Sequence, residues 1–210
     1  MNNQILVVTP INDGEAVQIA KILKDKNVKT LITKQGWGAS WDNLEPEIKK
    51  EIEELKNKNF KIFGVELQGT APEGAVNIDH HCYDGVDRSN EKSSLEQVAD
   101  LIGYKLSLYE EFVAANDKGF IPAMLALAKT KNLSKKETQK LIEKVRLQDR
   151  AAQGITPEQE RIAEKAIEEA EVSDHLTVVR MGHSKTATIC DRLYGKYKNL
   201  LVLSISISIR

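Results

Sequence analysis

The stretch Gln4-Ile-Leu-Val-Val-Thr9 is apolar and rich in β-branched residues, which predicts a buried strand. It runs into Pro10-Ile-Asn-Asp-Gly14, a composition typical of a turn. From Glu15 to Lys24 the apolar residues recur at helical spacing, so a helix is expected there. This strand, turn and helix form the repeating unit of α/β proteins.

The same alternation continues as far as residue 78. Further strands are predicted over residues 28–33, 60–67 and 75–78, a loop over 36–42 and an exposed helix over 44–58. The pattern therefore predicts an α/β fold with a mostly parallel sheet. Ligands of such sheets bind beyond the carboxyl ends of the strands, which is where functional residues are expected.

The middle of the chain is almost wholly helical, and β character returns near its C-terminus. We expect helices over residues 91–101, 107–116, 121–129, 134–145, 157–170 and 184–193, and strands over 176–179 and 200–209. The predicted layout is a main domain over 1–150, a helical linker over 151–174 and a short C-terminal module over 175–210. With so few strands, the last one either joins the main sheet or leaves that module incomplete.

Composition limits the possible functions. The 210 residues include 30 Lys and Arg against 31 Asp and Glu, a net charge of -1, so no broad basic surface for duplex nucleic acid is expected. Two cysteines and four histidines are too few for a disulfide scaffold and favour a reducing compartment, the cytoplasm. No apolar stretch reaches the roughly 20 residues of a membrane helix.

Ionisable side chains gather where the predicted strands end. Asp13 and Glu15 follow the first strand, Glu66 ends the third, Asp79-His80-His81 follows the fourth, and Asp117 lies in a turn between helices. Strand topology predicts that these groups converge. Carboxylates with one or two imidazoles suit Mn²⁺ or Mg²⁺, and a hydrolytic site with two ions would follow.

These segments resemble the DHH phosphoesterases, a family named for Asp-His-His. Val76-Asn-Ile-Asp-His-His81 is similar to the third motif of that family, Thr9-Pro-Ile-Asn-Asp-Gly-Glu-Ala16 to the first, Gly64-Val-Glu66 to the second and Ala114-Ala-Asn-Asp-Lys-Gly119 to the fourth. Ser93-Ser-Leu-Glu96 resembles the helix start that follows the third motif. The four motifs occur in the family's order over about residues 4–120.

The resemblance implies a doubly wound sheet, a pair of Mn²⁺ or Mg²⁺ ions and hydrolysis of a phosphodiester or phosphoanhydride. The metal ligands that it implies are Asp13, Glu15, Glu66, His80 and Asp117, while Asp79 and His81 are the implied catalytic pair, His81 contacting the phosphoryl group. The chain departs from the family at Thr9, where a histidine is usual, and at Glu15 and Glu66, where aspartate is usual, so one ion is expected to bind weakly.

Two weaker signals concern substrate binding. Trp37 and Trp41 lie in a glycine-rich loop, where they either stack on a base or anchor the loop as two buried indoles. The turn Gly182-His183-Ser184-Lys185 between a predicted strand and helix suits an anion, and it resembles the glycine-rich, His-containing turn of the family's C-terminal substrate domain. An ordinary capped turn is the alternative.

The sequence thus predicts a metal-dependent phosphoesterase acting on a short oligonucleotide, a cyclic dinucleotide or a pyrophosphate-like compound, with no membrane partner. The alternative is a non-catalytic relative that binds a nucleotide or phosphate in a regulatory or scaffolding role. A dinucleotide-cofactor enzyme is disfavoured because no Gly-x-Gly-x-x-Gly follows the first strand. Whether the protein forms a homodimer stays open.

Overall fold

The computed structural model describes residues 4–82, 85–88 and 90–204. The chain divides into two compact units, Met1–Val145 and Arg146–Arg210. The predicted division into 1–150, 151–174 and 175–210 stays a prediction. In the described part of the chain, no helix is long and apolar enough to cross a lipid bilayer.

Unit 1 is built on a parallel sheet of the strands β1 (Ile5–Thr9), β2 (Lys29–Ile32), β3 (Lys61–Val65) and β4 (Ala75–Ile78), in the order β2-β1-β3-β4. All five residues of β1 are buried, which explains why its first four side chains are apolar and the strand carries no charge. Because every pair is parallel, the carboxyl ends of the strands share one edge of the sheet.

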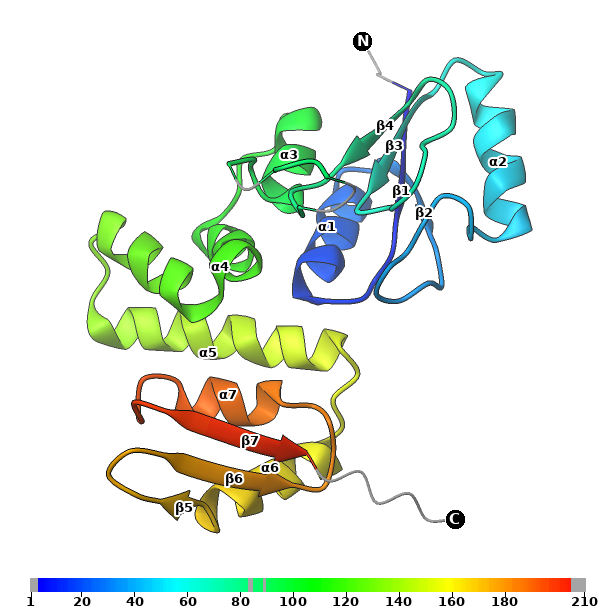
Figure 1. Cartoon of the computed structure of the whole chain (residues 1–210). Helices are drawn as coiled ribbons and strands as arrows, with labels where there is room; N and C mark the ends of the chain where they lie inside the picture. Colours follow the sequence, from blue (N-terminus) through cyan, green and yellow to red (C-terminus); the bar gives the residue numbers. More distant parts are fainter. Residues whose placement is uncertain (1–3, 83–84, 89, 205–210) are drawn as a thin grey trace, which may run out of the picture. The chain divides into compact units, whose positions relative to one another are not determined.

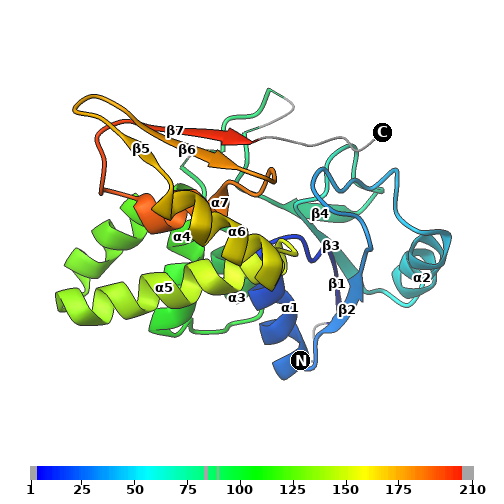
Figure 2. The same cartoon turned by 90° about the horizontal axis from the view of Figure 1, so that it is seen from below.

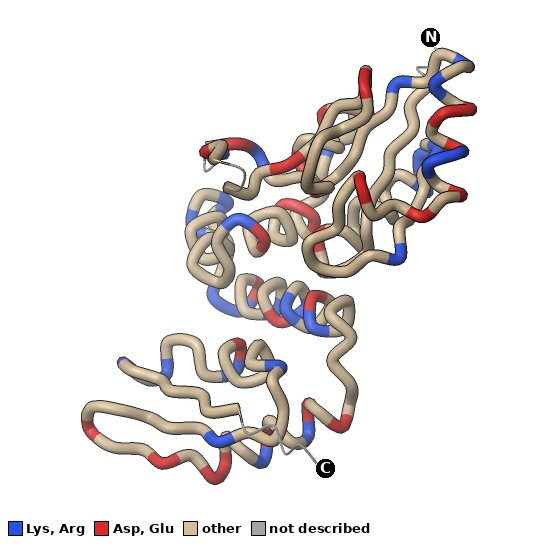
Figure 3. Tube along the Cα trace, turned by 45° about the vertical axis from the view of Figure 1, so that its right-hand side comes forward, with Lys and Arg blue, Asp and Glu red and all other residues tan. Residues whose placement is uncertain are grey.

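Helices cover both faces of this sheet, as a doubly wound fold requires (Figures 1 and 2). Ile5 and Val7 pack towards α1 (Gly14–Asp25), α3 (Ser94–Leu101) and α4 (Leu108–Thr130). Leu6 and Val8 face the opposite layer, which includes α2 (Pro46–Lys56). Acidic and basic residues follow one another along α2, as expected of a solvated helix (Figure 3). The predicted α/β fold is confirmed.

A kink in α4 replaces the turn that the sequence predicts between two helices. Gly119 has φ −169° and ψ 27°, and Phe120 has φ 56° and ψ −150°, so neither residue is helical. Pro122 follows in the first turn after the kink, where its missing N–H costs little. Asp117 therefore lies just before the break.

Unit 2 contains α6 (Pro157–Glu168), α7 (Ala187–Leu193) and a small mixed sheet of β5 (Glu171–Val172), β6 (Thr177–Met181) and β7 (Leu200–Ser204). Figure 2 shows both helices on one side of this sheet. β7 pairs parallel with β6, so within the described residues the C-terminal strand belongs to this sheet and not to the main one. The rest of the predicted strand, 205–209, lies outside the described residues.

Buried ion pairs hold the helical side of unit 2. The division between the units falls inside α5 (Lys135–Ala152), whose last turns carry Arg146 and Arg150. The Asp191 carboxylate accepts hydrogen bonds from Arg146 Nε at 3.0 Å and Arg150 Nη1 at 2.5 Å. Removing one partner of such a pair leaves an uncompensated charge, so these residues are structural.

Gly64 in β3 leaves room for the Trp41 indole. A Cβ atom at Gly64 would lie 2.1 Å from Trp41 Cζ2. We therefore predict that Gly64→Ala lowers the free energy of unfolding by about 1–3 kcal/mol or more, because the indole must leave its site. Urea unfolding measures this loss.

The control is Gly36→Ala, because a Cβ there meets nothing within 4 Å. In the Gly64→Ala background, Trp41→Leu should cost less stability than in the wild type, since it removes the clash. An unchanged stability of Gly64→Ala would contradict this packing.

Candidate metal centre

Ionisable groups from three different segments meet at the carboxyl edge of the main sheet. Glu66 directly follows β3, His80 and His81 follow β4, and Asp117 comes from α4. One ligand atom from each of these four side chains lies within 4.8 Å of the ligand atoms of the other three. The ends of β3 and β4 and the helix α4 thus bring together residues that are up to 51 positions apart, from 66 to 117.

His80 is at the centre of the group. Its Nε2 atom lies 2.8 Å from Asp117 Oδ2, and its Nδ1 atom lies 4.0 Å from Glu66 Oε1. Glu15, in the first turn of α1, places Oε2 3.9 Å from the same Nδ1 atom. His81 Nδ1 lies 3.8 Å from Glu66 Oε1. Three carboxylates and two imidazoles therefore surround one small volume.

Several of these atoms are buried without a hydrogen bond. Among the residues that the structure describes, Glu15 Oε2 and Glu66 Oε1 have no hydrogen-bond partner, and His80 Nε2 and Asp117 Oδ2 make no well-aligned hydrogen bond although they lie 2.8 Å apart. Leaving buried polar atoms poorly satisfied is costly, so this cluster calls for a ligand that its members can share. Carboxylate oxygen and imidazole nitrogen atoms fit a divalent cation such as Mn²⁺ or Mg²⁺.

The carboxylates of this cluster repel one another. Burial, and then the negative charges of Asp117 and Glu66, raise the pKa of Glu15 well above its ordinary value. Burial and Asp117 also raise the pKa of Glu66, although the two imidazoles oppose this. A nearby cation would favour the charged forms of these carboxylates. The cluster would therefore lower the stability of the metal-free protein, and binding of a metal ion would restore it.

The N-terminus of α3 holds two members of the cluster in place. The Ser94 N–H donates to His80 Nδ1 at 3.1 Å, and the Ser94 hydroxyl oxygen lies 3.3 Å from that nitrogen. The Leu95 N–H donates to Glu15 Oε1 at 3.0 Å. A capping box between Ser93 and Glu96 fixes the start of the helix. Sequence reasoning missed these contacts, since backbone N–H groups carry no residue signature.

Asp79 orients His81. The Asp79 Oδ1 atom accepts the His81 backbone N–H at 2.8 Å and lies 3.1 Å from His81 Nδ1. The hydrogen bond to Asp79 is the main reason why the pKa of His81 rises to about 9. Asp79 itself is buried, while 40% of the His81 side chain is exposed. His81 is therefore an accessible imidazole beside the cluster, and its hydrogen bond to Asp79 favours its protonated form.

Backbone strain marks the position of Glu66. Its φ of 53° lies in the left-handed region, which costs a non-glycine residue about 1–2 kcal/mol. The Glu66 N–H still donates to the Ile78 carbonyl at 2.9 Å, so the chain leaves β3 through a sharp turn. Strain at a residue whose side chain joins a buried cluster is typical of functional sites.

Asp13 and Thr9, from the first predicted motif, have other contacts. The Asp13 Oδ1 atom accepts the Ala16 N–H at 2.8 Å and so caps α1. Neither Asp13 nor Glu15 is in the group whose ligand atoms all lie within 4.8 Å of one another, and their roles as metal ligands stay predictions. The buried Thr9 hydroxyl donates to the Pro10 carbonyl at 3.0 Å.

The predicted substrate turn, Gly182-His183-Ser184-Lys185, lies in unit 2 after β6. His183 Nε2 lies 2.9 Å from the Gln159 carbonyl oxygen, and His183 Nδ1 accepts the Lys185 N–H at 3.2 Å. The Lys185 ammonium donates to the Gln153 carbonyl at 3.0 Å. These contacts give the turn a structural role, and its contact with substrate stays a prediction.

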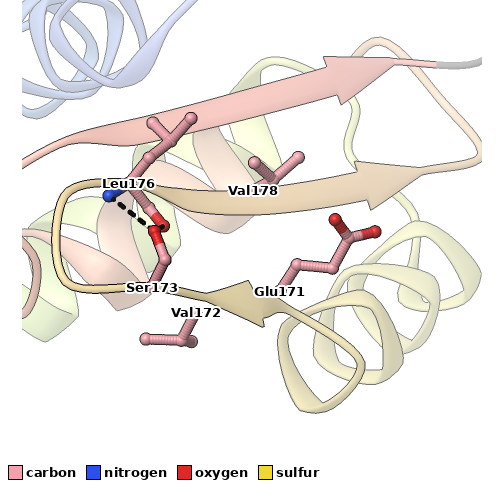
Figure 4. A pocket seen from close by; sticks show the side chains of 5 residues that line it. All are labelled: Glu171, Val172, Ser173, Leu176 and Val178. Atoms are coloured by element: carbon pink, nitrogen blue, oxygen red, sulfur yellow. Dashed lines mark hydrogen bonds between the residues drawn. The ribbon is translucent and has the colours of Figure 1, made fainter.

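A small pocket in unit 2 is unrelated to these predicted residues. Figure 4 shows its lining, which consists of Glu171, Val172, Ser173, Leu176 and Val178 from the β5–β6 hairpin. Its one carboxylate, Glu171, pairs with Arg180 at 3.1 Å. This pocket therefore lacks the cluster of ionisable groups that catalysis needs.

Comparisons with known proteins found matches among solved structures alone. No family model matches the chain, and no curated protein matches it. A solved structure described as a pGpG-specific phosphodiesterase from Vibrio cholerae is 16% identical in sequence, with a TM-score of 0.39. The match covers 87% of this chain and 70% of that one.

The buried carboxylates predict opposite effects of Glu15→Gln with and without metal. The folded pKa of Glu15 lies above the ordinary 4.5, so its charge costs stability once pH rises past that value. In metal-free protein we expect the variant to melt at a higher temperature than wild type at pH 8, and at nearly the same temperature near pH 4.5. The glutamine keeps an oxygen for the Leu95 N–H.

With Mn²⁺ added, the variant should gain less thermal stability than wild type, because a ligand charge is lost. Thermal melts with and without Mn²⁺ measure both effects, and Glu73→Gln, at an exposed position, is the control. The account fails if Glu15→Gln destabilises the metal-free protein at pH 8 and leaves the Mn²⁺ effect intact.

Proposed function

We propose that the protein is a metal-dependent phosphoesterase that hydrolyses a phosphodiester or phosphoanhydride in a small nucleotide-like substrate. The observation that carries this proposal is the cluster of buried carboxylates of Glu15, Glu66 and Asp117 around the His80 ring, with poorly satisfied oxygen atoms, beside the accessible imidazole of His81. A site for a divalent cation next to an accessible acid is what phosphoryl hydrolysis requires.

The resemblance to the DHH phosphoesterases supports the same proposal. Two of the departures from the family motifs keep a carboxylate at the cluster, since Glu15 and Glu66 both lie within 4.0 Å of the His80 ring. Glutamate reaches one methylene farther than aspartate, and the left-handed backbone of Glu66 changes the direction from which its side chain approaches. The longer side chains are therefore compatible with a metal centre.

Glu15, Glu66, His80 and Asp117 would hold Mn²⁺ or Mg²⁺, and the family resemblance favours two ions, of which Asp13 would help to bind one. A bound ion would polarise the phosphoryl oxygens and lower the pKa of a water molecule. Thr9 supplies no imidazole, so one ion is expected to bind more weakly.

His81 and Asp79 supply the acid. The Asp79 carboxylate favours the protonated form of the His81 ring and fixes its orientation. The ring can donate a hydrogen bond to a phosphoryl oxygen and give its proton to the departing oxygen. Gln97 donates to the Asp79 carbonyl at 2.9 Å and steadies the segment that carries both residues.

A non-catalytic phosphate or nucleotide binder is the second candidate. The absence of an imidazole at Thr9 favours it, because this reduces the ligand set of the first motif. We also propose a cytoplasmic location and substrate contacts from residues 182–185, on the sequence arguments above.

The test of the enzyme proposal is hydrolysis by protein loaded with Mn²⁺. Linear and cyclic dinucleotides and inorganic pyrophosphate are the substrates, and product formation is followed by chromatography. We predict turnover that depends on Mn²⁺, and a loss of kcat of about 10²–10⁴-fold in His81→Ala with unchanged Mn²⁺ content.

His175→Ala, which removes an exposed histidine in unit 2, is the matched control and should retain wild-type turnover. Wild-type turnover by His81→Ala would remove His81 from the mechanism. A protein that binds Mn²⁺ and hydrolyses none of these substrates would favour the non-catalytic binder.

A further inference from the structure

The two tryptophans of the loop between β2 and α2 have opposite environments. Trp41 is 3% exposed and packs against Gly64, whereas Trp37 is 67% exposed. A Cβ atom at Gly36 or Gly38, on either side of Trp37, would meet nothing within 4 Å. The reading of the loop as two buried indoles is therefore wrong for Trp37, whose ring is accessible to a ligand.

The stem below Trp37 is firmly held. The Gln35 side chain accepts the Ser40 N–H at 3.0 Å and donates to the Ser40 carbonyl at 3.1 Å. The Trp41 N–H donates to the Gln68 carbonyl at 3.1 Å, and the Gln68 N–H donates to the Ala39 carbonyl at 2.8 Å. Because these contacts hold the chain on both sides of residues 36–38, only this short segment has to be ordered when Trp37 binds a partner.

The same contacts connect Trp37 to the metal centre. Ala39 is two residues from Trp37, and Gln68, its hydrogen-bond partner, is two residues from Glu66. With 3.8 Å between consecutive Cα atoms and about 5 Å between paired strands, the Cα atoms of Trp37 and Glu66 lie at most about 20 Å apart. A short nucleotide substrate can reach from one to the other.

Further apolar side chains are exposed on the adjoining strand ends. Ile32, the last residue of β2, is 41% exposed and is paired with Thr9. Ile11 is 44% exposed and lies two residues after Thr9 and two before Asp13. The carboxyl edge of the sheet thus carries exposed apolar side chains on two neighbouring segments, beside the start of α1.

We propose that Trp37 is the stacking platform for a nucleobase of the substrate, with Ile32 and Ile11 as the adjoining apolar surface. This inference rests on the proposed phosphoesterase function, and it identifies the substrate class as a nucleotide and not a base-free phosphate. An aromatic ring stacks on any base, so Trp37 adds affinity without selecting among bases.

The test is the binding of the linear dinucleotide pApA and of inorganic pyrophosphate to full-length protein in the presence of Mg²⁺, measured by calorimetry. Trp37→Ala should weaken pApA binding roughly 5- to 150-fold, the range for loss of one stacked base. Pyrophosphate binding should not change. Trp37→Phe should restore most of the pApA affinity, because it keeps an aromatic face.

Tyr197→Ala, at a 39% exposed aromatic residue of unit 2, is the matched control and should bind pApA like wild type. Nucleotide binding should also quench the fluorescence of the exposed Trp37 in the wild type. Trp37→Phe lacks this signal and should show no such quenching. Wild-type pApA affinity in Trp37→Ala, or no pApA binding by wild type, would overturn the proposal.

Failure of the enzyme proposal gives a different result. If the wild type binds pApA through Trp37 but hydrolyses no substrate, the platform stands and the phosphoesterase proposal falls. If the wild type hydrolyses pApA and Trp37→Ala has the same KM, hydrolysis stands and the platform is overturned.

Discussion

The mutual repulsion of buried carboxylates around His80 is the constraint on which the functional part of this structure depends. Glu15, Glu66 and Asp117 are held close together although burial and mutual repulsion raise the pKa values of Glu15 and Glu66. The parallel strands bring their ends to one edge, and α3 supplies N–H donors that fix two of the groups. A fold that keeps such a destabilising cluster is consistent with a site that binds a cation.

The apolar layers on both faces of the main sheet compensate for this cost. The residues of β1 alternate between the two cores, and both cores lie below the carboxyl edge where the charged groups gather. The strained turn at Glu66 is likewise held by a hydrogen bond to Ile78 on the neighbouring strand. The rigid packing below the carboxyl edge therefore holds the repelling carboxylates and the strained Glu66 backbone in place. In an isolated loop, these groups would move apart.

Much of this arrangement could be predicted from sequence. β4 has the predicted bounds, and the rule that parallel strands share a carboxyl edge brings Glu66, His80 and His81 together. Two-residue β5 is too short to produce a periodic pattern. The cap formed by Asp13, the donors of α3 and the exposure of Trp37 depend on tertiary contacts, which residue types alone do not encode.

The most direct test of the central claim is the number of Mn²⁺ ions bound at equilibrium to metal-stripped protein, measured by dialysis and elemental analysis. The account predicts at least one tightly bound ion per chain in the wild type and the loss of that ion in His80→Ala, while His175→Ala binds as the wild type does. Equal binding by wild type and His80→Ala, or no specific binding, would contradict a metal centre at this edge of the sheet.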